Sequence, residues 1–521
     1  MSVGTATTQT LSSIPNGSRP QLANPSSESL SILTGTPPPP PPLSHLTYDI
    51  EHTPVKNDPR AWTPLRKNAS LALIALASMV ASLAANIQNP AVEEKEEDLP
   101  ATSSQFSLSI SLFILFQGVM PLLWSAVSEV KGRKLVYLVS LGLFTLGSVA
   151  VALSKRIGLV IGFRCLQGAG SSAVNAIGAA TLADIFDPAE RGKKVGIYYI
   201  ALVLGPALGP IFGGVLTAIW NWRAIFWFLS VLGGLIFALF FIFFHDTFRR
   251  ERSLTYQNIL KQRLRSAALL PLSYSDKSST AGRRWLQVDK PEVELEKAAE
   301  ATRTEETGRE LPADVQLNVT LSLTDVNPFK PLLLVVRRKN NFLIPLSSGL
   351  IFSFSFLVVY TTARTLARSY HYTPLKIGLV ALAYGIGCIL GSVVGGRWSD
   401  YEFERLSAAN GGKGDPEMRL GSTVLGVIFF PPSVVAFGWI CEKHVHVAVI
   451  CVFLFLTGFF SILIYSSSLT YIVDANVGRS STAVATNSAF RGMAAFIATE
   501  IAVPLQDGVG DGLDVYTLGG Y

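Results

Sequence analysis

The chain has 521 residues, of which 49% are hydrophobic and 15% are charged, and its mean hydropathy is +0.38. A charged fraction well below the usual quarter, together with positive mean hydropathy, argues against a cytosolic protein and indicates a membrane protein. The net charge of +6 is modest, and the basic residues gather in a few loops. They therefore indicate membrane topology, and we expect no binding to nucleic acid.

The first 67 residues are polar and rich in Ser and Pro, and they predict a disordered cytoplasmic tail. About 20 apolar residues are needed to cross a hydrocarbon core of roughly 30 Å. On that basis, six spans are predicted in residues 68–244 and five in 342–521, and the charged segment 245–341 predicts a cytoplasmic central loop. The predicted spans are 69–91, 105–127, 134–154, 157–184, 194–219, 223–244, 342–363, 375–399, 420–440, 446–470 and 481–504.

Lys and Arg groups adjoin the predicted spans on one side, which the positive-inside rule assigns to the cytoplasm. These groups lie near residues 60–67, 131–134, 191–194, 249–252 and 337–339. The opposite side carries the acidic run 93–98. Lys155, Arg156, Arg364 and Arg368 also fall on that side, as exceptions to the rule.

No combination of residues predicts catalysis or a cofactor site. Cys165, Cys388, Cys441 and Cys451 lie in or beside apolar segments without metal-ligand spacing. The sequence has no G-x-x-x-x-G-K-[ST] motif, so ATP-driven pumping is not expected. We therefore expect neither an enzyme nor a bound cofactor or metal.

A stripe of small residues runs through the fifth predicted span. Gly205, Gly209 and Gly213 recur every four residues, as do Pro206 and Pro210, so each set lies on one helical face. Two interior prolines would break a helix in water, but neighbouring helices can satisfy the freed backbone groups in a membrane. The glycine face predicts close approach of a second helix, and the prolines predict bending.

The two halves of the chain repeat a short pattern after their second span. Ser125 and Glu129 in 124–134 align with Gly396 and Asp400 in 395–405. Parallel repeated halves, with a site at their interface, are typical of secondary transporters.

Three segments resemble signatures of the major facilitator superfamily, specifically its fungal twelve-span drug:proton antiporters. They are 124–138, with Ser125 and Glu129 where the family has Gly and Asp, 163–173, and 204–214. The resemblance implies an all-α polytopic membrane protein with the major facilitator fold of two six-helix halves. The sequence ends where a twelfth span is expected to begin, so we expect either a truncated sequence or an eleven-span protein.

The resemblance also implies roles for two motifs. The loop motif would latch the inner face shut; the alternative is a plain basic anchor. The residues themselves predict a tight turn, because Gly132 allows the chain to reverse. Glu129 is expected to pair with a nearby cation. The latch residues are Ser125, Glu129, Gly132, Arg133, Lys134 and Asp400, and the antiporter-motif residues are Gly205, Pro206, Gly209, Pro210, Gly213 and Gly214.

Three ionisable residues inside predicted spans are candidates for proton coupling. Arg164 lies about 10 Å along the fourth span, where a charge is costly; the resemblance implies proton coupling, and the alternative is an anchor reaching the outer surface. Arg491 lies about 18 Å along the eleventh span, with Asn487 one turn earlier, so both are expected to meet a polar or anionic substrate group or to bind another span's backbone. Glu500 is either a proton carrier or a surface glutamate.

Polar and amphipathic residues inside the spans are candidates for a drug-sized, mostly apolar pocket. Individually, each is also an ordinary packing or interfacial residue. The candidates are Gln117, Asn175, Tyr198, Tyr360, Tyr384, Tyr465 and Asn487.

Together, the sequence predicts proton-coupled efflux of drugs, toxins or small amphipathic metabolites by alternating access. A truncated paralogue with a regulatory role or no activity is one alternative, and a nutrient importer of the same fold is another. The expected partners are the lipid bilayer, the small-molecule substrate and protons, and the protein is expected to be a monomer. The plasma membrane is the predicted location, with the vacuolar membrane as the alternative.

Overall fold

A computed structural model describes residues 55, 57–99, 101–249, 256–257, 336–337, 339–411, 414–476 and 480–509. All of these described residues belong to one compact unit, Ile50–Tyr521. The predicted disorder of the amino-terminal tail, most of the central loop and the missing twelfth span fall outside the described residues.

The first half of the chain forms a set of long helices, as predicted, with two short elements after the first. The predicted second span is divided at Pro121 into two helices. The elements are α1 (Pro64–Asn86), η3 (Asn89–Ala91), α2 (Val92–Asp98), α3 (Ser103–Val119), α4 (Pro121–Lys131), α5 (Arg133–Leu153), α6 (Ile157–Ile185), α7 (Pro188–Ile219) and α8 (Trp222–Phe243).

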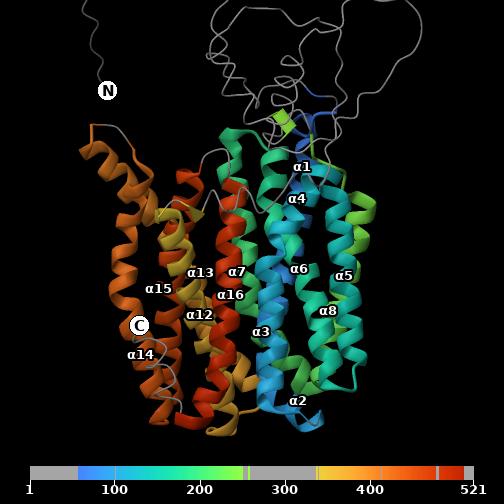
Figure 1. The fold of residues 1–521 in the computed structure, drawn as a ribbon, viewed down its shortest axis with the longest axis vertical. Helices are drawn as coiled ribbons and strands as arrows, with labels where there is room; N and C mark the ends of the chain where they lie inside the picture. Colours follow the sequence, from blue (N-terminus) through green and yellow to red (C-terminus); the bar gives the residue numbers. More distant parts are fainter. Residues whose placement is uncertain are drawn as a thin grey trace, which may run out of the picture. The chain divides into compact units, whose positions relative to one another are not determined.

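The second half is also helical, and no strand occurs among the described residues of either half. In Figure 1 its helices, coloured yellow to red, stand beside the blue and green helices of the first half. Its elements are α12 (Lys339–Arg368), α13 (Pro374–Ala409), η5 (Pro416–Thr423), α14 (Val424–Glu442), α15 (Val447–Ala475) and α16 (Ser480–Val509).

Within the described ranges, ten helical stretches are long and apolar enough to cross a membrane by length and composition. The eleventh predicted span, 481–504, does form helix α16, which packs along α3 and α12. The ten stretches do not include α16.

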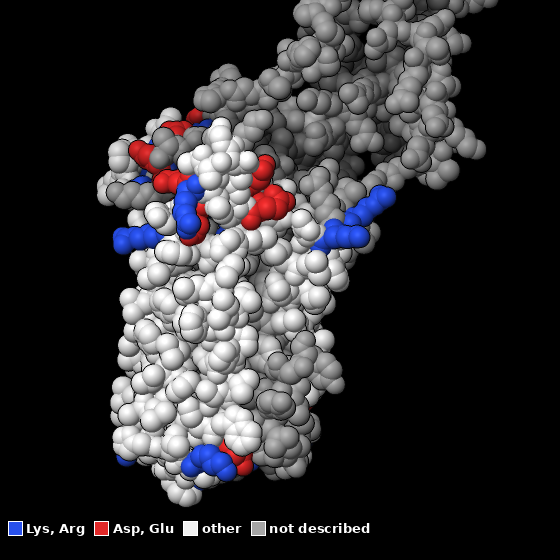
Figure 2. All heavy atoms as spheres, turned by 90° about the vertical axis from the view of Figure 1, so that its left-hand side faces the viewer, with Lys and Arg blue, Asp and Glu red and all other residues white. Residues whose placement is uncertain are grey.

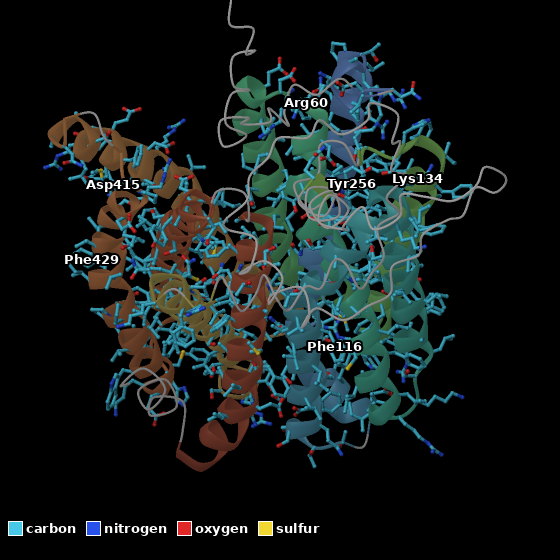
Figure 3. The ribbon with its side chains drawn as sticks, turned by 45° about the horizontal axis from the view of Figure 1, so that its top comes forward. Arg60, Phe116, Lys134, Tyr256, Asp415 and Phe429 are labelled. Carbon is cyan, nitrogen blue, oxygen red and sulfur yellow. The ribbon has the colours of Figure 1, made fainter. Side chains whose placement is uncertain are left out.

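Apolar side chains cover the outer surface of the helices. Figure 2 shows the face that carries α14 as a broad uncharged zone with charged side chains gathered at its two ends. Phe429 of α14 points outward from this face and is 51% exposed (Figure 3). A surface of this kind suits lipid, so the chain is a multi-pass membrane protein.

The glycine stripe of α7 permits the close helix packing that the sequence predicts. A Cβ atom on Gly205 would lie 2.5 Å from the Met79 carbonyl oxygen of α1, and one on Gly213 would overlap the Ile87 carbonyl. A different face of α7 meets α13 of the other half, where Gly378 lies against the Pro210 carbonyl. Helix α7 remains helical through both interior prolines and links the two halves.

Candidate functional site

A cavity of about 220 Å³ lies between the two halves, bounded by α1, α3, α4, α6 and α7 on one side and α12, α13, α15 and α16 on the other. Apolar side chains and neutral polar groups make up most of its wall. Seven of the residues singled out from the sequence line it: Gln117, Asn175, Tyr198, Pro206, Tyr384, Tyr465 and Arg491.

Two other candidates do not line this cavity. Tyr360 is 3% exposed and packs with the apolar core of the first half, although it belongs to α12 of the second half. Asn487 of α16 is 1% exposed, so it is buried where α16 packs against its neighbouring helices. Periodicity alone cannot separate a cavity-lining position from a neighbouring buried one, because both are on the inward face of a helix.

The polar side chains on the first-half wall are held by neighbours in the same half. Gln117 Nε2 donates to the Ala81 carbonyl at 3.1 Å and to Ser171 Oγ at 3.2 Å. Asn175 Oδ1 accepts from Ser78 Oγ at 2.8 Å. The Tyr198 hydroxyl donates to the Val174 carbonyl at 3.2 Å. This wall is therefore preorganised.

Arg491 reaches the cavity from α16. Its Nη1 donates to the Tyr465 hydroxyl at 2.7 Å, and its guanidinium carbon lies 3.9 Å from the Phe352 ring centre and 4.2 Å from the Tyr465 ring centre. Its buried Nε has no hydrogen-bond partner among the described residues. Phe352 was not singled out from the sequence, because one aromatic residue in an apolar span carries no distinguishing signal.

Polar contacts join the two halves toward the predicted outer end. Ser107 Oγ donates to the Thr499 carbonyl at 2.9 Å, and Ser111 Oγ donates to Glu500 Oε1 at 2.5 Å. Glu500 thus bridges α16 to α3 and does not line the cavity. Arg368 of α12 also lies 3.5 Å from Glu96 of α2.

Arg164 is fully buried inside the first half and does not line the cavity. Its Nη1 donates to Gln167 Oε1 at 2.5 Å, and its guanidinium carbon lies 3.9 Å above the Phe113 ring. Its Nε and Nη2 have no hydrogen-bond partner within the described ranges. Complete burial argues against an anchor that reaches the outer surface.

Lys95 of α2 is another buried cation, and the sequence did not predict its burial. It is 3% exposed, its Nζ donates to Gln88 Oε1 at 2.8 Å, and it lies 4.9 Å from the centre of the Phe226 ring. Arg164 approaches the same ring at 5.8 Å. Burial lowers the pKa of Lys95 well below 10.5; Arg164 lowers that pKa further and Glu94 raises it. Its setting in an acidic run made Lys95 look like a solvated surface charge.

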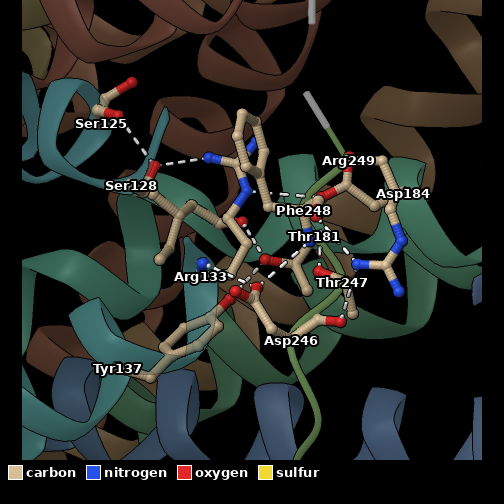
Figure 4. A network of polar contacts seen from close by, with 11 residues as sticks. Ser125, Ser128, Arg133, Tyr137, Thr181, Asp184, Asp246, Thr247, Phe248 and Arg249 are labelled. Carbon is tan, nitrogen blue, oxygen red and sulfur yellow. Dashed lines mark hydrogen bonds and ion pairs between the residues drawn. The ribbon is translucent and has the colours of Figure 1, made fainter. Parts of the chain in front are cut away.

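A polar network lies at the predicted inner end of the first half (Figure 4). Gly132 has a φ of 91°, which favours glycine, and a Cβ there would overlap the Asp246 carboxylate. Arg133 donates from Nη1 to Ser128 Oγ at 2.5 Å, and its Nε lies 3.3 Å from Asp184 Oδ2. The Arg133 backbone N–H donates to Asp246 Oδ1 at 3.0 Å.

No cation pairs with Glu129 among the described residues, contrary to expectation, and the Arg133 side chain pairs with Asp184 instead. Two other motif residues make backbone contacts. The Ser125 carbonyl accepts from Ser128 Oγ at 2.8 Å, and Lys134 Nζ donates to the Phe241 carbonyl at 3.0 Å.

The second half has a corresponding arginine–aspartate pair. Arg419 Nη1 lies 3.0 Å from Asp400 Oδ1, and its Nε lies 2.5 Å from Asp474 Oδ2. Asp184 and Asp474 are each the last residue but one of a 29-residue helix, α6 and α15. An acid at the same place in both repeats was the signal that could have revealed these pairs.

Two repeated helical halves around a central cavity define a membrane transporter. The sequence profile of the Major Facilitator Superfamily matches residues 74–499, so the chain belongs to this superfamily.

Similar proteins include several fungal transporters. The chain is 27% identical to "MFS antiporter QDR3" of Candida albicans, over 88% of this chain and 76% of that protein. It is 26% identical to "Quinidine resistance protein 3" of Saccharomyces cerevisiae, over 88% and 81%. It is also 26% identical to "Citrate exporter 1" of Aspergillus niger, over 86% and 81%.

A bacterial homologue of the lysosomal transporter Spinster, solved in an inward-facing and unoccupied conformation, is similar in fold. Its TM-score is 0.57 at 13% identity, covering 88% of this chain and 92% of that one. The human organic anion transporter MFSD10 gives a TM-score of 0.52 at 16% identity, covering 88% and 98%. At these identities the likeness concerns the fold.

Proposed function

We propose that the protein exports small, largely apolar compounds in exchange for protons by alternating access. The observation that carries this proposal is the cavity between the repeated halves, with polar contacts between the halves on the predicted outer side. Such an arrangement suits loading from the cytoplasm and release after the halves rock about the cavity. The names of three relatives support export. They are an antiporter of Candida albicans, a resistance protein of Saccharomyces cerevisiae and an exporter of Aspergillus niger.

Arg164 is the proposed coupling residue. It is a fully buried cation whose contacts in the described structure are neutral acceptors and aromatic rings. Such a charge is costly, and protonation of a nearby group or a change of its partner would alter that cost. Each 100 mV of membrane potential adds about 2.3 kcal/mol per charge moved, which a proton exchanger can use.

We place the protein in the plasma membrane as a monomer, with the bilayer, protons and its substrate as partners. In this proposal, the loop motif with Arg133 and the pair of Arg419 with Asp474 hold the inner ends during the cycle.

The test is transport by the full chain in proteoliposomes with an imposed pH gradient. A preloaded fluorescent amphipathic compound should move against its own gradient while protons move the other way, and a protonophore should abolish this movement. Empty liposomes are the control. Movement of the compound in the same direction as the protons, or movement that ignores the protonophore, would contradict proton-coupled export.

A further inference from the structure

We infer that the cavity selects compounds carrying one negative charge, such as a carboxylate on an apolar body, and that Arg491 binds that charge. This inference rests on the proposed export function, whose substrate class it narrows.

Charge is distributed unevenly in the cavity wall. Of the described residues that line it, Arg491 alone is charged, and the remaining wall is apolar or neutral. A cation in such a site attracts anions and repels cations, and the low-polarity surroundings strengthen both effects. The wall therefore favours anionic over cationic compounds.

The guanidinium of Arg491 is positioned but not neutralised. The Phe352 and Tyr465 rings lie 3.9 and 4.2 Å from its central carbon, and Tyr465 accepts one of its hydrogen bonds at 2.7 Å. Among the described residues, Arg491 has no ion-pair partner, and its buried Nε has no acceptor. A planar guanidinium with unused N–H groups binds a carboxylate through paired hydrogen bonds. The missing partner thus has the chemistry of an anion.

Other cations do not share this site. Arg164 is fully buried and does not line the cavity, and Lys95 lies in α2 near Phe226. One accessible cation can neutralise one negative charge, so further charges on a substrate would be buried without partners. This argument distinguishes a monoanion from a di- or trianion.

The apolar side of the cavity suits the rest of such a molecule. Ile351, Phe352, Phe356 and Val359 line it from α12, on the helix that places Phe352 beside Arg491. A ligand with its carboxylate at Arg491 would lay its apolar body along this wall, as in binding pockets where few polar groups set the orientation.

The test compares a fluorescent amphipathic carboxylate with its neutral primary amide, its dicarboxylate analogue and an amine of the same shape. Binding to the purified full chain is measured first, and export from proteoliposomes second. We expect the monocarboxylate to bind best. Arg491→Gln should weaken its binding by about tenfold to a hundredfold, the usual range for a lost hydrogen bond to a charged group. The same variant should bind the amide as the wild type does.

Two variants serve as controls. Arg491→Lys keeps the charge without the paired hydrogen bonds, so it should keep the preference for anions over amides with reduced affinity. Ser461→Ala removes a neutral wall group and should leave the charge preference unchanged. Unchanged amide binding shows that Arg491→Gln is folded.

The outcomes separate this inference from the export proposal. Equal binding of carboxylate and amide by the wild type, tightest binding of the amine or the dicarboxylate, or an unchanged preference in Arg491→Gln would overturn the inference. Selective anion binding without gradient-driven export would support the inference and contradict proton-coupled export.

Discussion

The two halves of the molecule share their packing but differ in their buried charges. Arg164 is the eighth residue of α6, and Leu454 is the eighth residue of α15, the corresponding helix of the second half. Both side chains are buried, at 0% and 1% exposure. The same packing position therefore holds a cation in one half and an apolar residue in the other. At this position the repeat preserves the packing, while only the first half has a charge there.

The inner ends of the halves are more alike. Each has an arginine paired with the aspartate near the end of α6 or α15. In the first half the side chains of Arg133 and Asp184 are 8% and 26% exposed, whereas those of Arg419 and Asp474 are 14% and 36% exposed. The pair in the first half is thus more enclosed, and Ser128 and Asp246 extend it.

The largest expected effect comes from making the first half resemble the second. Arg164→Leu should reduce gradient-driven export by about a hundredfold or more, the scale for losing a residue whose charge controls a proton-transfer step. Its thermal stability should not fall, because the variant no longer buries a charge that costs about 2.5 kcal/mol or more in a membrane. Proteoliposome export and the melting temperature (Tm) in detergent measure the two effects.

The matched control is Leu454→Met in the second half. A volume-conserving change of this kind costs less than about 1.5 kcal/mol and should leave export coupled to the gradient. Undiminished coupling in Arg164→Leu would show that the difference between the halves has no role in transport.

The sequence predicts the helical halves and the close packing of α7, because long apolar segments and four-residue glycine spacing are local patterns. It does not predict the partner of Arg133, since Asp184 lies 51 positions away and only the folded bundle brings them together. Lys95 was missed for a related reason: an acidic run at the end of a span resembles a solvated loop until Trp222 and Phe226 cover its lysine. Local patterns identify the faces of helices, whereas charge pairing depends on tertiary contacts.

The paired arginines should respond unequally to loss of their acids. Asp184→Asn should lower the free energy of unfolding by about 2–3 kcal/mol, because it leaves the enclosed Arg133 with less compensation. Asp474→Asn should cost about 1 kcal/mol, as expected for a more exposed pair. Denaturation in detergent monitored by circular dichroism measures both.

Asp400→Asn is the control for removing a carboxylate at the inner surface. The Asp400 side chain is 72% exposed, so we expect a change below about 0.5 kcal/mol. Equal losses for Asp184→Asn and Asp474→Asn would remove the distinction between the two inner ends.

Lys95 gives the first half a pH dependence. Because burial lowers its pKa in the folded protein, the unfolded chain binds a proton more readily between the folded pKa and 10.5, and stability rises with pH in that window. Lys95→Met lacks this cost, so its Tm should exceed that of the wild type most at the acidic end of the window, and the excess should shrink as pH approaches 10.5. Lys95→Arg, which stays charged throughout, should instead fall behind the wild type as pH rises. A constant difference across the window would contradict a buried, costly ammonium.

The smallest expected effect concerns the outer contact between the halves. Arg368 Nη2 lies 3.5 Å from Glu96 Oε2, and the two side chains are 47% and 20% exposed. Glu96→Gln should therefore change the equilibrium between closed and open outer ends by about 0.5 kcal/mol, or roughly twofold. Ser107→Cys, at the buried contact of α3 with α16, reports this opening through its rate of labelling by a polar thiol reagent. Asp98→Asn is the matched control, because Asp98 lies on the same short helix but pairs with Arg223 of its own half. Faster labelling with Glu96→Gln alone identifies a contact that acts between the halves, whereas equal rates in the two variants would mean that the acidic helix α2 stabilises only the half to which it belongs.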